Sequence, residues 1–279
     1  MNLALQANPI LQKYIADYAV KMSLKNREDR FRAEALPYER KYKDMLRETF
    51  SSQSDELSHA ILAFKSKAFE DYMIDWEKYR IIYNEFGQLT LPDAMSNWGN
   101  IELEALEVGI SFNVQNPYIR EAIFTRANKF ADTVVNTTRE WLHVIITDSI
   151  ERQEGPYQLE KRIRAFYKDM SKTRAISIAR TETIFAMNDA AERSYIQSGV
   201  VQFKQFYTSR DERRCPFCAS LHGKRLPVGV NYFNQGESLT VMVDGKPKTM
   251  TFNYENVSHP PVHVRCRCTI LPITFMDSD

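Results

Sequence analysis

The cysteines of this chain lie close together at one end of the sequence. All of them fall in the last 65 residues, as Cys215 and Cys218 in C-P-F-C and as Cys266 and Cys268 in H-V-R-C-R-C. His263 in the second motif is a fifth candidate for the four places of a tetrahedral zinc site. A C-x2-C motif holds two thiolates within reach of one ion, and ligands from distant sequence complete the site. Such binding ties two segments together, and its free energy becomes folding free energy.

Two other interpretations of the thiols remain open. Free cysteines are often buried as small core residues, and four cysteines can form two disulfides. The opening M-N-L-A-L-Q-A-N-P is short and lacks a basic region, so we expect no signal segment and a reducing compartment, which favours metal. The 44 residues between Cys218 and His263 do not fit a standard zinc finger. We predict structural Zn²⁺ on Cys215, Cys218 and Cys266. The fourth ligand is either His263 or Cys268.

Charge is unevenly distributed along the chain, although the formal net charge is +1. Residues 1–159 hold 19 Lys/Arg against 24 Asp/Glu, a net of −5, while residues 160–279 hold 18 against 12, a net of +6. A basic half can attract nucleic acid or an acidic protein surface, but an ordinary solvated face also carries such a charge. No stretch approaches the roughly 20 apolar residues that span a bilayer, so we expect no transmembrane segment.

The basic half contains candidate phosphate contacts and two further histidines. Basic side chains interleaved with Tyr232, Phe233 and Tyr254 would give salt-dependent binding that ignores base sequence. His222 and His259 lie near the cysteines in sequence, and each is a weaker alternative ligand. The candidate nucleic-acid contacts are Lys224, Arg225, Lys246, Lys248, Arg265 and Arg267.

The first 86 residues contain no glycine and are typical of long, charged helices. Apolar residues recur at intervals of three and four over residues 10–87. Pro37 is expected to end or kink a helix, and the polar run 51–55 to break the pattern again. Residues 87–117 hold several glycines and prolines and predict a connecting region with short elements. The long charged helices expected in the first 86 residues suit bundles and docking on a partner.

Further helices are expected over residues 117–150, from 156 onward and over 173–198, with Gly199 in the C′ position. The period then changes to that of strands. Strands are predicted at residues 201–207, 239–243 and 248–252, with Asp244-Gly245 as a hairpin turn, and at 270–273. We therefore predict an α+β fold with a mainly α-helical N-terminal two-thirds and a small mixed α/β C-terminal domain that carries a zinc knuckle.

Part of the C-terminal half resembles a known family. Residues 174–183, R-A-I-S-I-A-R-T-E-T, are followed by Asn188, Ala190 and the closing Gly199, as in the A-R-T-E helix of phage Mu protein F-like minor head proteins. A strand, an aspartate beside basic residues (Asp211), a C-x2-C pair, a proline-rich H-x-x-C-R-C segment and a short apolar tail follow in the family's order.

The resemblance is specific over residues 173–272. One departure concerns the family pattern H-P-x-C-R-C: here Val264 follows His263, and two prolines precede the histidine. The resemblance extends more weakly to Trp98, Gly109, Ser111-Phe112 and Asn116-Pro117.

The resemblance implies a non-enzymatic head morphogenesis protein of a tailed phage. Members of the family are low-copy internal head components associated with the portal vertex, and some influence assembly or the route of DNA during ejection. The implied location is the interior of the head in the virion, and the bacterial host cytoplasm during assembly. The implied partners are the portal protein, scaffold or major capsid protein, and phage DNA bound non-specifically.

We divide the chain into three regions on this basis. Residues 1–86 form a charged helical region for partner docking, residues 87–172 a helical region with a connecting segment, and residues 173–279 the Mu F-like domain with the Cys/His metal site. Arg180 and Glu182 lie two apart on one helix, so they point to different faces and are expected to form ion pairs between domains. For Glu182, a general base is the alternative.

Asp211 lies beside the C-x2-C motif, where a carboxylate can orient a zinc ligand but more often caps a turn.

Two other functions compete with the head protein. A zinc-dependent hydrolase or nuclease needs an open coordination place and usually histidine or carboxylate ligands, which a cysteine-rich site opposes. A cellular zinc-bearing nucleic-acid-binding protein is the other. The sequence contains no P-loop, dinucleotide-binding fingerprint or H-E-x-x-H motif.

Overall fold

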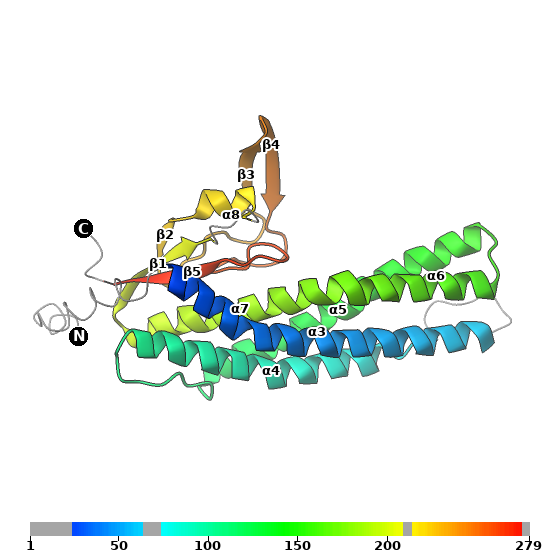
Figure 1. Ribbon diagram of the computed structural model, residues 1–279, viewed down its shortest axis with the longest axis horizontal. Coiled ribbons are helices and arrows are strands. Elements are labelled where there is room, and N and C mark those ends of the chain that lie inside the picture. Colours follow the sequence, from blue (N-terminus) through cyan, green and yellow to red (C-terminus); the bar gives the residue numbers. More distant parts are fainter. Residues whose placement is uncertain (1–23, 64–73, 209–213, 275–279) are drawn as a thin grey trace, which may run out of the picture. The chain divides into compact units, whose positions relative to one another are not determined.

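The computed structural model describes residues 24–63, 74–208 and 214–274. It confirms the α+β class, with helices in the N-terminal part and a small strand region near the C-terminus (Figure 1). The predicted helical pattern at residues 10–23 and 64–73 lies outside the described residues. The helices are α3 (Leu24–Ala63), α4 (Trp76–Ala105), α5 (Pro117–Glu151), α6 (Pro156–Asp169), the π-helical turn η1 (Met170–Arg174), α7 (Ala175–Ser198) and α8 (Pro216–Leu221). The strands are β1 (Val201–Tyr207), β2 (Arg225–Pro227), β3 (Ser238–Val243), β4 (Lys246–Thr251) and β5 (Thr269–Thr274).

Helix α3 runs without interruption through both predicted breaks, so it ends neither at Pro37 nor at the serine-rich run, while a kink at Pro37 stays a prediction. Two polar side chains of that run have hydrogen-bond partners while the backbone stays helical. Ser52 Oγ donates to the carbonyl of Glu48 at 3.1 Å, and the buried Gln53 donates from Nε2 to the Tyr83 hydroxyl at 3.2 Å. The helix also tolerates the single N–H bond lost at Pro37. Tertiary packing here outweighs local preference.

The connecting region expected over residues 87–117 is largely helical, because α4 continues into it. Its glycines allow close packing rather than a turn. A Cβ at Gly87 would lie 3.0 Å from the Cβ of Ala127, and a Cβ at Gly99 would lie 2.4 Å from the ring of Phe112. Both glycines are therefore explained by the near approach of another segment.

Among the later helices, the start of α5 and the end of α7 agree with the prediction, whereas the start of α7 does not. Helix α5 begins at Pro117, and Asn116 Oδ1 accepts a hydrogen bond from the amide of Tyr118 at 3.0 Å. The helix expected from Thr173 has no separate start, because η1 joins α6 to α7. Gly199 follows α7 with a φ of +67°, as a C′ glycine should.

The predicted strands and hairpin are confirmed. Strand β1 is the middle of an antiparallel sheet in the order β2–β1–β5. Strands β3 and β4 form a separate antiparallel hairpin, which is labelled in Figure 1. Its turn residues Asp244 and Gly245 have φ values of 50° and 73°, the sign that a type I′ turn needs at both positions.

The chain divides into two compact units built from interleaved stretches. Unit 1 comprises Met1–Pro37, Ala94–Val114 and Arg180–Asp279, and unit 2 comprises Tyr38–Asp93 and Gln115–Ala179. The division into three consecutive regions describes the chain differently and stays a prediction. No helix within the described ranges is long and apolar enough to cross a membrane.

Each unit has its own apolar core. Unit 2 is helical, and its core is formed by large side chains such as Tyr42, Phe130 and Ile163. The core of unit 1 includes Trp98, Tyr195, Phe206 and Phe252, together with three buried cysteines. The thiols are therefore part of the interior of unit 1 rather than of an exposed loop.

Candidate metal centre

The C-P-F-C motif forms the start of the short helix α8. Cys215 is the N-cap residue, and its Sγ accepts a hydrogen bond from the amide of Cys218 at 3.3 Å. Pro216 follows at the first helical position, where its fixed φ is suitable and no N–H is needed. The cap therefore turns both thiol groups of the motif toward the same point.

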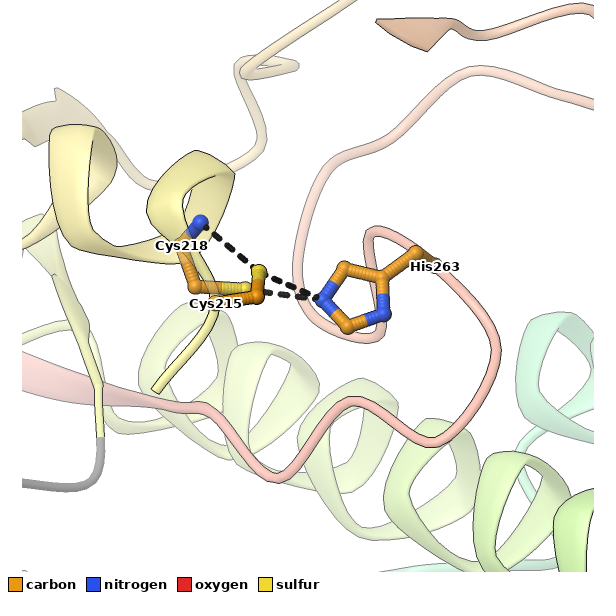
Figure 2. A group of neighbouring side chains, drawn as sticks. All are labelled: Cys215, Cys218 and His263. Carbon is orange, nitrogen blue, oxygen red and sulfur yellow. Dashed lines mark hydrogen bonds between the residues drawn. The ribbon is translucent and has the colours of Figure 1, made fainter. Parts of the chain in front are cut away.

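His263 faces both of these sulfur atoms (Figure 2). Its Nε2 lies 3.1 Å from Cys215 Sγ and 3.1 Å from Cys218 Sγ. On the other side of the ring, Nδ1 lies 2.8 Å from the carbonyl oxygen of Val264, so the N–H at Nδ1 donates to it. Metal-binding histidines usually have this arrangement, in which one nitrogen is fixed by a carbonyl and the other faces the ion.

The second motif brings two more thiols to the same place. Cys218 Sγ lies 3.8 Å from Cys266 Sγ, and the sulfur atoms of Cys218, Cys266 and Cys268 all lie within 4.8 Å of one another. Two sulfur ligands of tetrahedral zinc, each at about 2.3 Å, would be about 3.8 Å apart. All four cysteines are free, so the two-disulfide interpretation is not found in this structure.

The ligand atoms form two overlapping groups. Cys215, Cys218 and His263 make one, and Cys218, Cys266 and Cys268 make the other. Cys218 belongs to both and is therefore the centre of the cluster. His263 belongs to the first group and Cys268 to the second. The choice between them that the sequence left open is thus a choice between the two groups.

Electrostatics favours a thiolate at Cys215 and Cys266 and a thiol at Cys218 and Cys268. A hydrogen bond from Cys218, opposed by burial and aided by His263, lowers the pKa of Cys215 to about 4. Burial alone would lower the pKa of His263, but the hydrogen bond with Cys215 and the nearby Cys266 raise it to about 9. Burial opposes ionisation of Cys266, yet hydrogen bonds with Cys218 and Cys268 hold the pKa of Cys266 well below its usual value. Hydrogen bonds with Cys215, Cys266 and Cys268, together with burial, raise the pKa of Cys218. A hydrogen bond with Cys218 lowers the pKa of Cys268, but Cys266 and burial outweigh it and raise that pKa.

This donor set fits a soft or borderline metal ion. Thiolate and imidazole ligands in tetrahedral spacing are those of zinc and iron–sulfur proteins, whereas calcium and magnesium require oxygen. Cys218, Cys266 and Cys268 are buried, and Cys215 and His263 are partly buried. These groups can therefore hold a metal ion that is shielded from bulk water.

The segment before Cys266 is fixed by contacts with the core. Val262 is fully buried, and its carbonyl accepts a hydrogen bond from the Tyr254 hydroxyl at 2.7 Å. The amide of Cys266 donates to the carbonyl of His263 at 3.1 Å and closes a turn. Arg265 within that turn has a φ of 64°, a conformation that residues other than glycine rarely adopt.

The other candidate ligands lie in different surroundings. Nδ1 of His222 accepts a hydrogen bond from the amide of Thr208 at 3.2 Å, and Nδ1 of His259 lies 2.7 Å from the carbonyl of Pro260. Neither histidine belongs to a metal-binding group among residues 24–63, 74–208 and 214–274. Asp211 lies outside the described residues.

Helix α7 contains the two charged residues to which we assigned interdomain ion pairs. Glu182 is buried and Arg180 is partly buried, and both belong to unit 1. Each has a polar or electrostatic partner. The interdomain role stays a prediction.

The candidate nucleic-acid contacts come from three separate segments. Lys246 and Lys248 lie on the same face of β4, opposite Val243 and Val241 of β3. Lys224 precedes β2, and its Nζ lies 5.4 Å from the ring centre of Phe233. Five of the six side chains are exposed, while Arg267 is partly buried; DNA binding by them stays a prediction.

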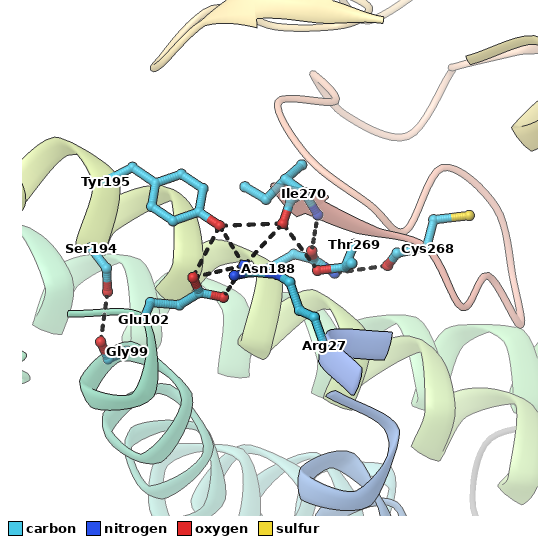
Figure 3. Close-up of polar contacts among 9 residues, drawn as sticks. All are labelled: Arg27, Gly99, Glu102, Asn188, Ser194, Tyr195, Cys268, Thr269 and Ile270. Atoms are coloured by element: carbon cyan, nitrogen blue, oxygen red, sulfur yellow. Dashed lines mark hydrogen bonds and ion pairs between the residues drawn. The ribbon is translucent and has the colours of Figure 1, made fainter. Parts of the chain in front are cut away.

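Two buried ion pairs of unit 1 were not predicted from the sequence. Arg27 pairs with Glu102 and also donates to the Tyr195 hydroxyl at 2.8 Å, while Lys204 of β1 pairs with Glu192 of α7 (Figure 3 shows the first network). A charged residue on an otherwise apolar face was the signal available for Glu192. The identity of its partner depends on the fold.

Comparison with known proteins supports the family read from the residues. Residues 141–271 match the model of the family described as Phage Mu protein F like protein. The chain is also 23% identical over 239 residues to the uncharacterized protein YqbB of Bacillus subtilis (strain 168), covering 84% of this chain and 73% of that protein. No solved structure matches. The family match confirms the resemblance that we drew from the A-R-T-E and Cys/His motifs.

Proposed function

We propose, from the phage Mu protein F-like family to which residues 141–271 belong, that this chain is a minor head protein of a tailed phage. The family indicates head morphogenesis and a non-enzymatic, structural role. Within that role we assign the chain to the inside of the head at low copy number, next to the portal protein. During assembly it would be found in the host cytoplasm.

The thiol-rich cluster of unit 1 is the observation that supports a structural role. It offers more donors than a tetrahedral ion needs, so protein atoms would fill every place. A hydrolytic zinc keeps a place open for water and is usually held by histidine or carboxylate. Bound Zn²⁺ would here join α8 to the segment before β5 and stabilise unit 1.

We assign the four places to Cys215, Cys218, His263 and Cys266. Nδ1 of His263 is fixed by the carbonyl of Val264, and Nε2 lies at equal distances from two sulfur atoms. Both observations support this set over one that contains Cys268. Replacing His263 with alanine should weaken zinc binding strongly, while Cys268→Ser should retain one ion per chain. The opposite result, measured by zinc release to a chromophoric chelator, would transfer the fourth place to Cys268.

The partners that we propose follow from the family and from the charges. The helical N-terminal part would dock on the portal protein, with scaffold or major capsid protein as further contacts. The exposed lysines of β4 and the segment before β2 would contact phage DNA without regard to its sequence, during packaging or ejection.

Quantitative mass spectrometry of purified virions and procapsids tests this function. A minor head protein should be found at a few copies per particle in both. Absence from both, with the chain abundant in the soluble fraction of infected cells, would contradict the head assignment and favour a nucleic-acid-binding or enzymatic role outside the particle.

A further inference from the structure

Asn188 of α7 contacts the chain on both sides of β5's first residue. Its side chain is fully buried, and Nδ2 donates to the carbonyl of Cys268 at 3.1 Å while Oδ1 accepts from the amide of Ile270 at 3.1 Å. Nδ2 also donates to the carbonyl of Ile184 at 2.9 Å, which fixes the amide on its own helix. The amide thus acts as a neighbouring strand would, bonding one carbonyl and the amide two residues later (Figure 3).

A second contact on the same helix holds the other end of this segment. The amide of Arg265, in the left-handed turn, donates to Thr181 Oγ1 at 3.2 Å. Thr181 and Asn188 are seven residues apart, about two turns, so both side chains project from the same face of α7. Cys266 lies between the two contacts, and the carbonyl of Cys268 is part of the second.

We propose that Thr181 and Asn188 are positioning residues of the metal centre. This inference rests on the metal site proposed above. Helix α7 fixes the backbone of the C-R-C segment at two points, one on either side of Cys266, and so sets the direction in which its thiolate points. Contacts outside the ligand shell that orient ligands in this way typically change metal affinity by about 10- to 100-fold.

The chain contains a matched control for Asn188. Asn100 of α4 also donates from Nδ2 to the carbonyl four residues earlier, Ser96, at 2.8 Å, and its Oδ1 accepts the amide of Phe112 at 2.8 Å. It fixes a loop of unit 1 in the same manner, but that loop has no thiol. An aspartate at either position keeps the acceptor and loses the donor.

Co²⁺ titration of the full-length chain tests the proposal, because thiolate-to-metal charge transfer and tetrahedral d–d bands report ligand geometry directly. We expect Asn188→Asp to weaken Co²⁺ binding by about 10- to 100-fold and to change the d–d bands. Asn100→Asp should alter thermal stability but leave the affinity within about twofold and the bands unchanged. Thr181→Val should weaken binding less, and Thr181→Ser should restore it.

The two hypotheses fail in different ways. A wild-type chain that binds neither Co²⁺ nor Zn²⁺ would overturn the metal site itself. If the wild type binds and Asn188→Asp matches Asn100→Asp in affinity and spectrum, the positioning role is wrong while the site stands. Should Asn188→Asp not fold, the Thr181 pair decides alone: equal affinity in Thr181→Val, Thr181→Ser and wild type overturns the proposal.

Discussion

The two units bury different kinds of polar side chain. In unit 2, the buried polar residues within the described ranges are all uncharged, whereas unit 1 buries arginine, lysine and glutamate as well as its thiols. Those of unit 2 are Thr49, Gln53, Ser54, Ser58, Thr90, Thr138 and Ser149. The charged ones of unit 1 are Arg27, Glu102, Glu182, Glu192 and Lys204.

This difference predicts how each unit tolerates substitution. Apolar helix packing accepts exchanges of similar volume, since it depends mainly on the area removed from water. Buried charges and metal ligands depend on one specific partner, and loss of that partner leaves a desolvated group without compensation. A single substitution at a buried charge or at a thiol should therefore destabilise unit 1 strongly, whereas the described residues of unit 2 include neither kind of group.

Removal of Cys218 should have the largest effect, because this thiol belongs to both ligand groups. Structural zinc contributes on the order of 10 kcal/mol in small metal domains. We expect Cys218→Ser, or treatment with a strong chelator, to abolish hydrogen-exchange protection in β1 and β5 while α5 and α6 stay protected. The matched control is Ser220→Ala, an exposed position of the same helix. Equal loss of protection in both units would refute the contrast between them.

The pair of Lys204 and Glu192 should come next. Both side chains are buried, with exposures of 0% and 7%, and Glu192 also accepts the amide of Gly229 at 3.0 Å. Lys204→Ala leaves Glu192 buried without its partner and should lower the free energy of unfolding by about 3–5 kcal/mol. The double variant Lys204→Met, Glu192→Leu should recover much of that loss. Urea unfolding of each variant measures this.

The urea unfolding test of the Lys204–Glu192 pair has a control variant and an outcome that would contradict it. Lys248→Ala, at an exposed position of β4, should change stability by less than about 0.5 kcal/mol. If the double variant were as unstable as Lys204→Ala alone, the cost would come from lost packing rather than from an unpaired charge.

Unit 2 should respond to volume instead of charge. Ile163 is fully buried, and Ile163→Ala should lower the free energy of unfolding by about 2–5 kcal/mol through lost apolar burial and a cavity. Leu89→Ala, at a side chain that is 73% exposed in the same unit, should have little effect. Metal affinity should be unchanged in both variants. A fall in zinc affinity for Ile163→Ala would show that the units are energetically coupled.

The sequence predicted the helices, the strands and the thiol cluster because each has a local signature. Spacing of apolar residues defined α5 to α7, Asp244-Gly245 defined the hairpin, and two Cys motifs defined the candidate site. The errors arose where distant segments decide. Gly99 was assigned to a connecting region, but it lies within α4, where the Phe112 ring leaves no room for a Cβ.

The same limit applies around the site. That Thr181 and Asn188 contact the backbone on either side of Cys266 depends on how β5 lies against α7, and no spacing in the sequence encodes it. The partner of Glu192 is likewise unknown until β1 is placed. The candidate ligands could thus be identified from residue type, whereas the residues that contact the backbone beside them could not.

The smallest expected effect is a pH dependence confined to unit 1. Burial would raise the pKa of Asp189, but its contacts with His259 and Arg193 hold that pKa below the usual value. The folded state then binds this proton less tightly than the unfolded chain, so the stabilisation is present above about pH 4 and is lost as the pH falls through the lowered value. We expect Asp189→Asn to be less stable than wild type near neutral pH, by on the order of 1 kcal/mol, and the difference to vanish in acid.

Urea midpoints from about pH 6 to about pH 3 measure that difference. Asp244→Asn is the matched control, because asparagine suits the same left-handed turn position and the side chain is exposed. The control should follow the wild-type curve throughout. If Asp189→Asn also followed it, the contacts of Asp189 would contribute nothing to stability. The contrast with unit 2 would then rest on the candidate metal centre and on the two buried ion pairs of unit 1.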